Sequence, residues 1–291
     1  QVDGVYQIGT AEELAWFAAA VNDGTASSAD VVLTEDIDLN NKEWTPIGND
    51  DNGYAGIFDG ANNTVKNMSL TVPTDYMGLF GYVAGQIKNL TVSGKIAANG
   101  HTACYLGGIV GWLWGSISNC TSNVNITISE YVVDDSYCGG ICGVYETEEN
   151  ESFTIIDCTN NGNINVKVNP ESGSATVSGI AGTVLCNMGD SKIEACRNMG
   201  KLQLELTGFG TAYVSGIAAI NSYGNGTAGL INSCYNIGKL EASGDPNKGG
   251  CTYACAGISV SYDEINEKYY PLNSYYQKDT TFNFIYNVFN L

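Results

Sequence analysis

Short apolar segments recur along the whole chain and are separated by glycine and polar residues. One recurring phrase joins glycine to an apolar residue, and its glycine returns at intervals of 30, 32, 39, 37 and 41 residues. Self-similarity at such a period is the signature of a repeat architecture. The six copies of this step are Gly78-Leu79, Gly108-Ile109, Gly140-Ile141, Gly179-Ile180, Gly216-Ile217 and Gly257-Ile258.

A second apolar phrase follows each copy of the first, and one of its positions is also periodic. Four cysteines occupy it at intervals of 38 residues: Cys120, Cys158, Cys196 and Cys234. Leu90 holds the same place in the first copy and Tyr275 in the last. A third phrase follows this position and opens on Gly94, Gly162, Gly200 or Gly238. Each repeat therefore contains three short apolar segments with glycine and asparagine at the corners.

This pattern predicts an all-β fold, a right-handed parallel β-helix with three short strands per coil. Each strand would pair with its equivalent one coil away, ~4.8 Å distant, so that like residues stack into ladders. The apolar residues of the glycine step would form one inward ladder and the cysteines another. We expect Asn160, Asn198 and Asn236 to form a corner ladder, because stacked amides bond coil to coil and asparagine tolerates left-handed backbone. A leucine-rich or helical solenoid competes, but the chain predicts only one helix.

That helix lies at the start of the chain and would cap the open end of the coils. Thr10 and Glu13 form a capping box, and Gly24 is placed to end the helix. Its apolar face consists of Leu14, Phe17, Ala18 and Val21. We predict a single domain over residues 1–291, with an N-terminal cap to about residue 30, coils over 31–265 and a C-terminal cap over 266–291. The aromatic-rich tail would cover the other end, or would form an aromatic binding surface.

Charge and composition narrow the possible partners. Twelve Lys and Arg against 31 Asp and Glu give a net charge of −19, which opposes binding to nucleic acid and to anionic membranes. No apolar run is long enough to insert into a membrane. The chain opens on Gln1-Val2-Asp3 without a leader, so either the protein is cytosolic or a leader has been removed. We expect an acidic monomer.

Two of the glycine steps carry a family resemblance. Gly78-Leu79-Phe80-Gly81 and Gly108-Ile109-Val110-Gly111, each followed by Ile-x-Asn-x-Thr, resemble the GLUG repeat, as does the lead-in over residues 44–68. GLUG proteins are bacterial surface or secreted proteins, among them proposed adhesins and the non-catalytic part of immunoglobulin-A-protease-type metallopeptidases. The resemblance covers roughly residues 5–280, and its final glycine is replaced in the last two copies, by Ala219 and Val260. It implies a non-catalytic secreted or cell-surface adhesin, binding module or rigid stalk, with a surface protein or glycan as ligand.

The alternative is a carbohydrate-active β-helix enzyme, either a polysaccharide lyase or a hydrolase. Polyuronate lyases commonly use arginine or lysine as the base, and Arg197 is the single arginine, while a histidine-dependent site would have to use His101, the single histidine. Glycosidases need two facing carboxylates, and with 31 Asp and Glu candidate pairs are too easy to find to discriminate. His101 lies in a turn-like segment and Arg197 stands beside a ladder cysteine, so we expect neither to be catalytic. The pair Asp134-Asp135 follows His101 in the wrong order for a polygalacturonase-like site, and no Gly-His-Gly segment exists.

Calcium is the one cofactor for which the sequence offers a candidate site. Asp50, Asp51 and Asn52 place oxygen ligands together on one loop, and Asp36 and Asp38 alternate on one strand. The loop lacks the distal glutamate of a helix-loop-helix calcium site, and a solvated turn is the simpler interpretation. We therefore expect no bound cofactor.

The ten cysteines do not form an evident disulfide framework. Ladder thiols would point in parallel rather than at one another, and a buried thiol behaves as a small apolar group. Cys138 and Cys255 occupy a position that Leu106, Val177 and Val214 also hold, which indicates packing. Three others fall outside the ladders and could pair or stay free: Cys104, Cys186 and Cys251.

Overall fold

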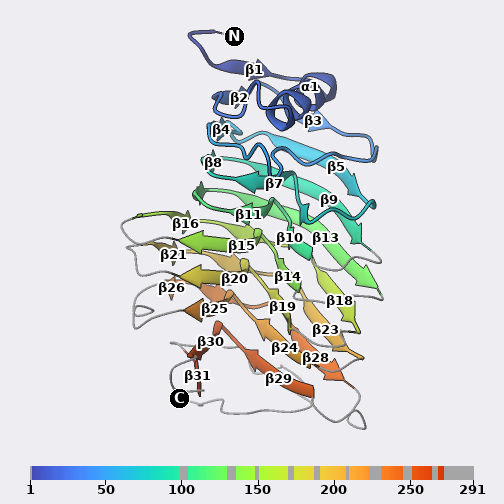
Figure 1. The fold of residues 1–291 in the computed structure, drawn as a ribbon, viewed down its shortest axis with the longest axis vertical. Coiled ribbons are helices and arrows are strands. Elements are labelled where there is room, and N and C mark those ends of the chain that lie inside the picture. The colour runs from blue at the N-terminus through green and yellow to red at the C-terminus, as the bar shows by residue number, and fades with distance from the viewer. Residues whose placement is uncertain are drawn as a thin grey trace.

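The computed structural model of this chain is an elongated stack of parallel strands, and Figure 1 shows the coils following one another down its long axis. The structure describes residues 2–98, 104–129, 136–147, 151–169, 174–186, 191–207, 210–222, 231–244, 251–263 and 268–271. Within these ranges the strands form four sheets. A coil passes through each sheet in turn, so each sheet contains equivalent segments of successive coils.

Sheets 1 and 2 are built from short strands, two to six residues long. Sheet 1 contains, in spatial order, β1 (Tyr6–Ile8), β2 (Val31–Leu33), β4 (Ile57–Asp59), β8 (Gln86–Lys88), β12 (Ser116–Ser118), β16 (Thr154–Ile156), β21 (Lys192–Glu194) and β26 (Ile231–Asn232). Sheet 2 contains β6 (Tyr76–Met77), β10 (Cys104–Gly107), β14 (Ser136–Gly139), β19 (Ser174–Ser178), β24 (Gly210–Ser215) and β29 (Cys251–Ala256).

Sheet 3 is built from strands of four to six residues, and sheet 4 includes the longest strands. Sheet 3 contains β7 (Phe80–Val83), β11 (Val110–Leu113), β15 (Cys142–Thr147), β20 (Ala181–Cys186), β25 (Ala218–Ser222), β30 (Ser259–Asp263) and β31 (Lys268–Pro271). Sheet 4 contains β3 (Ile37–Asp38), β5 (Thr64–Leu70), β9 (Thr91–Ala98), β13 (Thr121–Ser129), β17 (Thr159–Asn160), β18 (Ile164–Val168), β22 (Arg197–Asn198), β23 (Leu202–Leu206), β27 (Tyr235–Asn236) and β28 (Leu240–Gly244).

The β-helix fold is confirmed. The predicted number of three strands per coil was wrong, because the strands form four sheets. The glycine step bends the chain, so that the segment predicted as one strand is split between sheets 2 and 3, for example into β10 and β11 around Gly108-Ile109. The bend brings the backbones of neighbouring coils so close that only glycine fits. A Cβ on Gly108 would lie 2.3 Å from the Gly140 carbonyl oxygen. In the later coils the sheet 4 segment is also divided, as in β17 and β18.

Helix α1 (Ala11–Asn22) covers the N-terminal end of the stack, as predicted. The Thr10 hydroxyl accepts a hydrogen bond from the Glu13 amide, and the Glu13 carboxylate accepts from the Thr10 amide, which completes the capping box. Gly24 follows the helix with a φ of 85°, the left-handed conformation that ends a helix. All four residues of the predicted apolar face are buried. The strand β1 precedes the helix and already pairs with β2, so sheet 1 begins within the segment predicted as a cap.

The core inside the coils consists of the predicted ladders. The six apolar residues of the glycine steps are all at most 3% exposed: Leu79, Ile109, Ile141, Ile180, Ile217 and Ile258. Register is fixed from coil to coil, since Leu106, Cys138, Val177, Val214 and Cys255 are successive partners in sheet 2. This register confirms the packing role predicted for Cys138 and Cys255.

The asparagine ladder is also confirmed, and it packs on the glycine steps. Asn160 donates to the Asn198 side-chain oxygen at 2.8 Å, and Asn198 donates to Asn236 at 2.7 Å. Each amide also donates to the carbonyl of the glycine two residues later. A Cβ on Gly179 would lie 2.4 Å from the Asn198 Cβ, so glycine in the step makes room for the ladder.

The left-handed corner residue is not the one predicted. The three ladder asparagines lie in strands, and positive φ angles of 50–55° occur instead one residue before the cysteine-ladder position. The reason is that the chain turns between sheets 1 and 4 there, before the asparagines are reached. These corner residues are Asn89, Asn119, Asp157, Ala195 and Ser233.

At the C-terminal end of sheet 3, β31 pairs antiparallel with β30 and ends at Pro271. Proline lacks an amide hydrogen, so β31 cannot donate a backbone hydrogen bond at its last residue. The aromatic tail over residues 272–291, including Tyr275, lies outside the described residues. Helix α1 is too short to cross a membrane, and the described part of the chain contains no helix that could.

Candidate functional site

The predicted calcium loop serves mainly to hold the N-terminal cap in place. The Asn52 amide donates to the Asn22 carbonyl at the end of α1 at 3.0 Å, and the Asn52 backbone amide donates to the Asn49 side chain at 2.8 Å. Asp50 accepts a hydrogen bond from the Tyr76 hydroxyl. In the part of the chain that the structure describes, no three His, Cys, Asp or Glu side chains cluster as metal ligands would. Asp50, Asp51 and Asn52 stay an untested calcium candidate, beside the solvated turn that the sequence favours.

The two aspartates of the other calcium candidate stabilise coil corners. Asp36 accepts from the Thr64 backbone amide at 2.8 Å, one coil further on. Asp38 accepts from the Asn67 side chain and the Asn40 backbone amide, both at 2.8 Å. These bonds, with the Asn67 contribution first, lower the pKa of Asp38 below its ordinary value.

Of the groups considered for enzymatic chemistry, Arg197 can be placed. It is exposed in β22, as expected of a strand-end residue, and its Nε donates to the Thr159 hydroxyl at 2.7 Å in the adjacent coil. His101, Asp134 and Asp135 lie outside the described residues, as do the side chains of Cys104, Cys186 and Cys251.

The cysteine ladder is a row of free thiols packed along the core. Cys120, Cys158 and Cys196 are fully buried, Cys234 is half-buried, and all four are free thiols. Burial raises the pKa of Cys158, and the hydrogen bond to its neighbouring thiol raises the pKa of Cys196. Since the thiolate is the nucleophilic form, these shifts oppose catalysis by the ladder.

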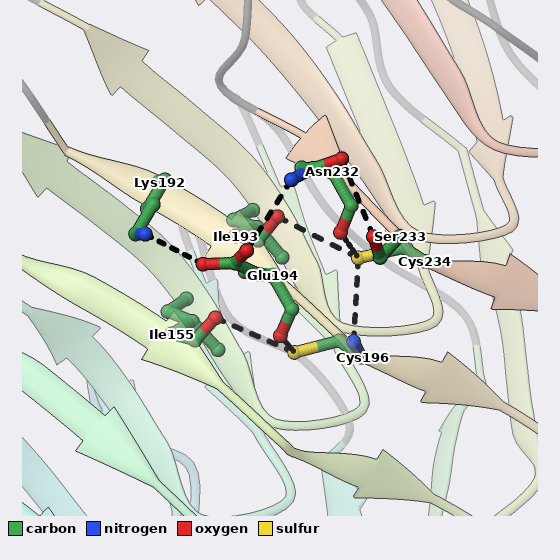
Figure 2. A network of polar contacts seen from close by, with 8 residues as sticks. All are labelled: Ile155, Lys192, Ile193, Glu194, Cys196, Asn232, Ser233 and Cys234. Carbon is green, nitrogen blue, oxygen red and sulfur yellow. Dashed lines mark hydrogen bonds and ion pairs between the residues drawn. The ribbon is translucent and has the colours of Figure 1, made fainter.

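Figure 2 shows how the last two thiols of the ladder are held. The Cys196 sulfur lies 3.4 Å from the Ile155 carbonyl oxygen. The Cys196 backbone amide donates to the Cys234 sulfur at 3.3 Å. Next to them, Glu194 pairs with Lys192 at 2.5 Å and accepts from Asn232 at 3.3 Å. The sulfurs follow the coil repeat side by side, and this network ties neighbouring coils together.

A candidate binding surface lies elsewhere, on the outer face of sheets 2 and 3. We call it the aromatic patch, and its members are all half-buried: Tyr76, Tyr82, Tyr105, Trp112 and Tyr137. Tyr105 neighbours the core residue Leu106 in β10, and Trp112 neighbours Leu113 in β11, so both rings point to the opposite, outer side.

The tyrosines of sheet 2 form a stacked row along the axis of the coils. Tyr76 and Tyr105 are register partners with ring centroids 5.5 Å apart and an interplanar angle of 23°. Tyr105 and Tyr137 are also partners, at 6.0 Å and 14°. Both faces of Tyr105 are therefore covered by other rings. The next partner in the row is Thr176, which ends the stack.

Trp112 and Tyr82 stand across this row from sheet 3. They are register partners one coil apart. Trp112 lies 4.9 Å from Tyr105 at 82° and 5.9 Å from Tyr76 at 80°. Because the faces of Tyr105 are occupied, its edge must meet the face of the indole. Edge-to-face contact of this kind is a favoured aromatic geometry.

Carboxylates fix two of the rings at the margin of the patch. The Trp112 Nε1 donates to the Glu146 Oε2 at 2.9 Å. At the other end, burial and the bond to Asp50 raise the pKa of Tyr76 above its ordinary value. The patch thus combines ring surfaces with carboxylate oxygens that accept hydrogen bonds.

The repeat pattern of the sequence did not predict the aromatic patch. The tyrosines are spaced by 29 and 32 residues, because the coils differ in length, so they do not match the even period of the cysteines. The signal was an aromatic residue two positions after the core residue that follows the glycine step. It occurs in Phe80-Gly81-Tyr82 and Val110-Gly111-Trp112, one residue beyond the second glycine of the repeated phrase.

Comparison with known proteins confirms the repeat class. The GLUG motif matches residues 102–127, which contain the Gly108-Ile109-Val110-Gly111 copy. Halomucin of Haloquadratum walsbyi is 29% identical over 150 residues, which is 46% of this chain but only 2% of Halomucin. The chain thus matches a small part of a much longer relative.

A solved structure supports the architecture. The chain resembles the crystal structure of a candidate immunoglobulin A1 protease from Bacteroides ovatus with a TM-score of 0.60. The match covers 98% of this chain and 84% of that one, at 19% sequence identity. At this identity the likeness establishes the fold and leaves the activity open.

Proposed function

We propose that this chain is a non-catalytic binding module of a secreted or surface-exposed bacterial protein, acting as an adhesin or as a rigid stalk that presents a binding face. The observation that carries the proposal is the aromatic patch: five half-buried rings gathered on the outside of a coil stack. Large aromatic side chains held in place by neighbours are typical anchors of binding surfaces.

Three further features support a binding role over a catalytic one. Three of the periodic thiols, Cys120, Cys158 and Cys196, are buried in the core, and burial raises the pKa of Cys158. The corner aspartates and ladder asparagines bond to the next coil. The chain matches the GLUG motif and part of Halomucin, and this likeness supports a surface protein. Side chains used in this way stiffen the scaffold on which the patch sits.

The proposal is tested by measuring binding and turnover on the same panel. Purified chain is applied to arrays of host and plant glycans and of host matrix proteins, and the bound polysaccharides are then analysed for cleavage. We expect saturable binding with no release of reducing ends or unsaturated products, with or without calcium. Turnover that disappears in Arg197→Ala or His101→Ala would establish the carbohydrate-active enzyme instead.

A further inference from the structure

We propose that the aromatic patch binds a neutral, extended polysaccharide, with the indole face of Trp112 as the main platform and Tyr82 as a second one. This inference rests on the proposed function as a binding module and adds the site and the class of ligand.

The platform follows from how the rings cover one another. The stacked tyrosines turn their faces to each other along the axis, so these faces are not open to a ligand. Trp112 receives the Tyr105 and Tyr76 edges on one face, which leaves its other face directed away from the tyrosine row. A ring that is supported from behind and anchored through Nε1 to Glu146 loses little conformational freedom when it binds.

A sugar ring is complementary to such a platform. The axial C–H groups of a pyranose form a weakly positive apolar face, which suits the negative face of an indole. Its equatorial hydroxyls donate hydrogen bonds, and Glu146 and Asp50 provide acceptor oxygens beside Trp112 and Tyr76.

The repeat of the coils favours a polymer over a single sugar. Tyr82 and Trp112 are register partners, so they are separated by one coil, ~4.8 Å along the axis. A pyranose unit advances an extended glycan chain by a similar length, so successive units can meet successive rings. The row ends where Val144 follows Trp112 in the register.

Charge decides which polysaccharides fit. From β6 to β25, the described strands of sheets 2 and 3 contain no lysine or arginine, whereas Glu146 and Asp50 flank the patch. With a net charge of −19, the protein repels uronate and sulfate groups. Both carboxylates already accept from ring donors, which favours hydroxyl recognition over capture of a cationic peptide.

Calorimetric titration of the intact chain tests the ligand class. The neutral probes are the hexamers of β-linked glucose, xylose and mannose. The charged probes are oligogalacturonate, oligochitosan and oligoarginine. We expect at least one neutral hexamer to bind, with an affinity that changes little with salt. Failure of all three neutral hexamers, or binding of oligoarginine alone that weakens with salt, would overturn the inference.

Variants test the site. Trp112→Ala should weaken binding of the neutral hexamer by about tenfold or more, as removal of an aromatic anchor does. Trp16→Ala is the matched control, because Trp16 is 55% exposed on α1, far along the chain from the patch. Unchanged affinity in a folded Trp112→Ala protein would overturn this inference, because the ligand would then bind at another site of the module. Turnover of the probe would overturn the proposed function itself.

Fluorescence provides a readout that does not need the alanine variant to fold. The hexamer should shift the tryptophan emission of the wild-type chain, and this shift should vanish in Trp112→Phe, which keeps a ring but loses the indole. A shift that persists in Trp112→Phe would show that the ligand lies elsewhere.

Discussion

Substitutions in the asparagine ladder would test quantitatively how strongly the coils are held together. Asn198 is fully buried and makes three side-chain hydrogen bonds: from Asn160 at 2.8 Å, to Asn236 at 2.7 Å and to the Gly200 carbonyl at 3.0 Å. Asn198→Ala removes all three. At about 1 kcal/mol for each bond, the loss should be about 3 kcal/mol, and more if a partner is left without a bond in the core.

Asn198→Asp adds a dependence on pH. An aspartate there cannot donate to Asn236 or Gly200, and burial raises its folded-state pKa above the unfolded value of ~3.9. A raised folded pKa means that stability is present below the unfolded pKa and is lost as pH rises through the folded pKa. The aspartate variant should therefore be closest to wild type near pH 4 and weakest at pH 7.

The assay is urea unfolding followed by circular dichroism, with each variant compared with wild type at the same pH. Asn161→Ala is the matched control, since Asn161 is exposed and makes one bond to Asn123 at 2.9 Å in the preceding coil. It should cost about 0.5 kcal/mol or less. If Asn198→Ala is no worse than Asn161→Ala, or if the aspartate variant grows more stable with rising pH, the ladder does not bind the coils as inferred.

Three further predictions follow from the corners and the core. Cys158 should not react with a thiol reagent until the chain unfolds, and Cys158→Ala should lower the free energy of unfolding by about 1 kcal/mol. Mass spectrometry that finds Cys158 disulfide-linked to a ladder neighbour would contradict the packing. Ala195→Asn should raise the free energy of unfolding by about 0.5–1 kcal/mol, because φ at this corner is 55°, and a lower melting temperature would contradict this. Because its pKa is lowered, Asp38 stabilises the fold above its unfolded pKa, and this stabilisation is lost as pH falls through the folded pKa. Asn67→Ala should move the folded pKa of Asp38 back toward its ordinary value in an NMR titration, and an unmoved pKa would refute the assignment.

The ladders could be predicted because identical positions of the repeat share one environment. The 38-residue spacing of the cysteines located a core position, and the asparagines two residues later lie in register as expected. The helical cap was equally accessible, since its capping box and apolar face are local signals.

Two features of the fold could not be predicted from the spacing of the repeats. The left-handed corner falls on Asn89, Asp157 and Ala195 among others, and residues so different show no shared sequence pattern. The aromatic patch depends on rings from two sheets meeting in space, which requires knowing that the glycine step divides one segment into two strands. Both depend on the angle between successive strands rather than on composition.

Hydrogen–deuterium exchange on the intact chain, with and without a saturating neutral hexasaccharide, tests most directly whether the outer face of sheets 2 and 3 is the binding face. Slower exchange is predicted in β6, β7, β10, β11 and β14, which hold the aromatic patch, with sheet 4 unchanged. Slower exchange confined to sheet 4, or no change in the patch strands at saturation, would contradict a binding module built on these rings.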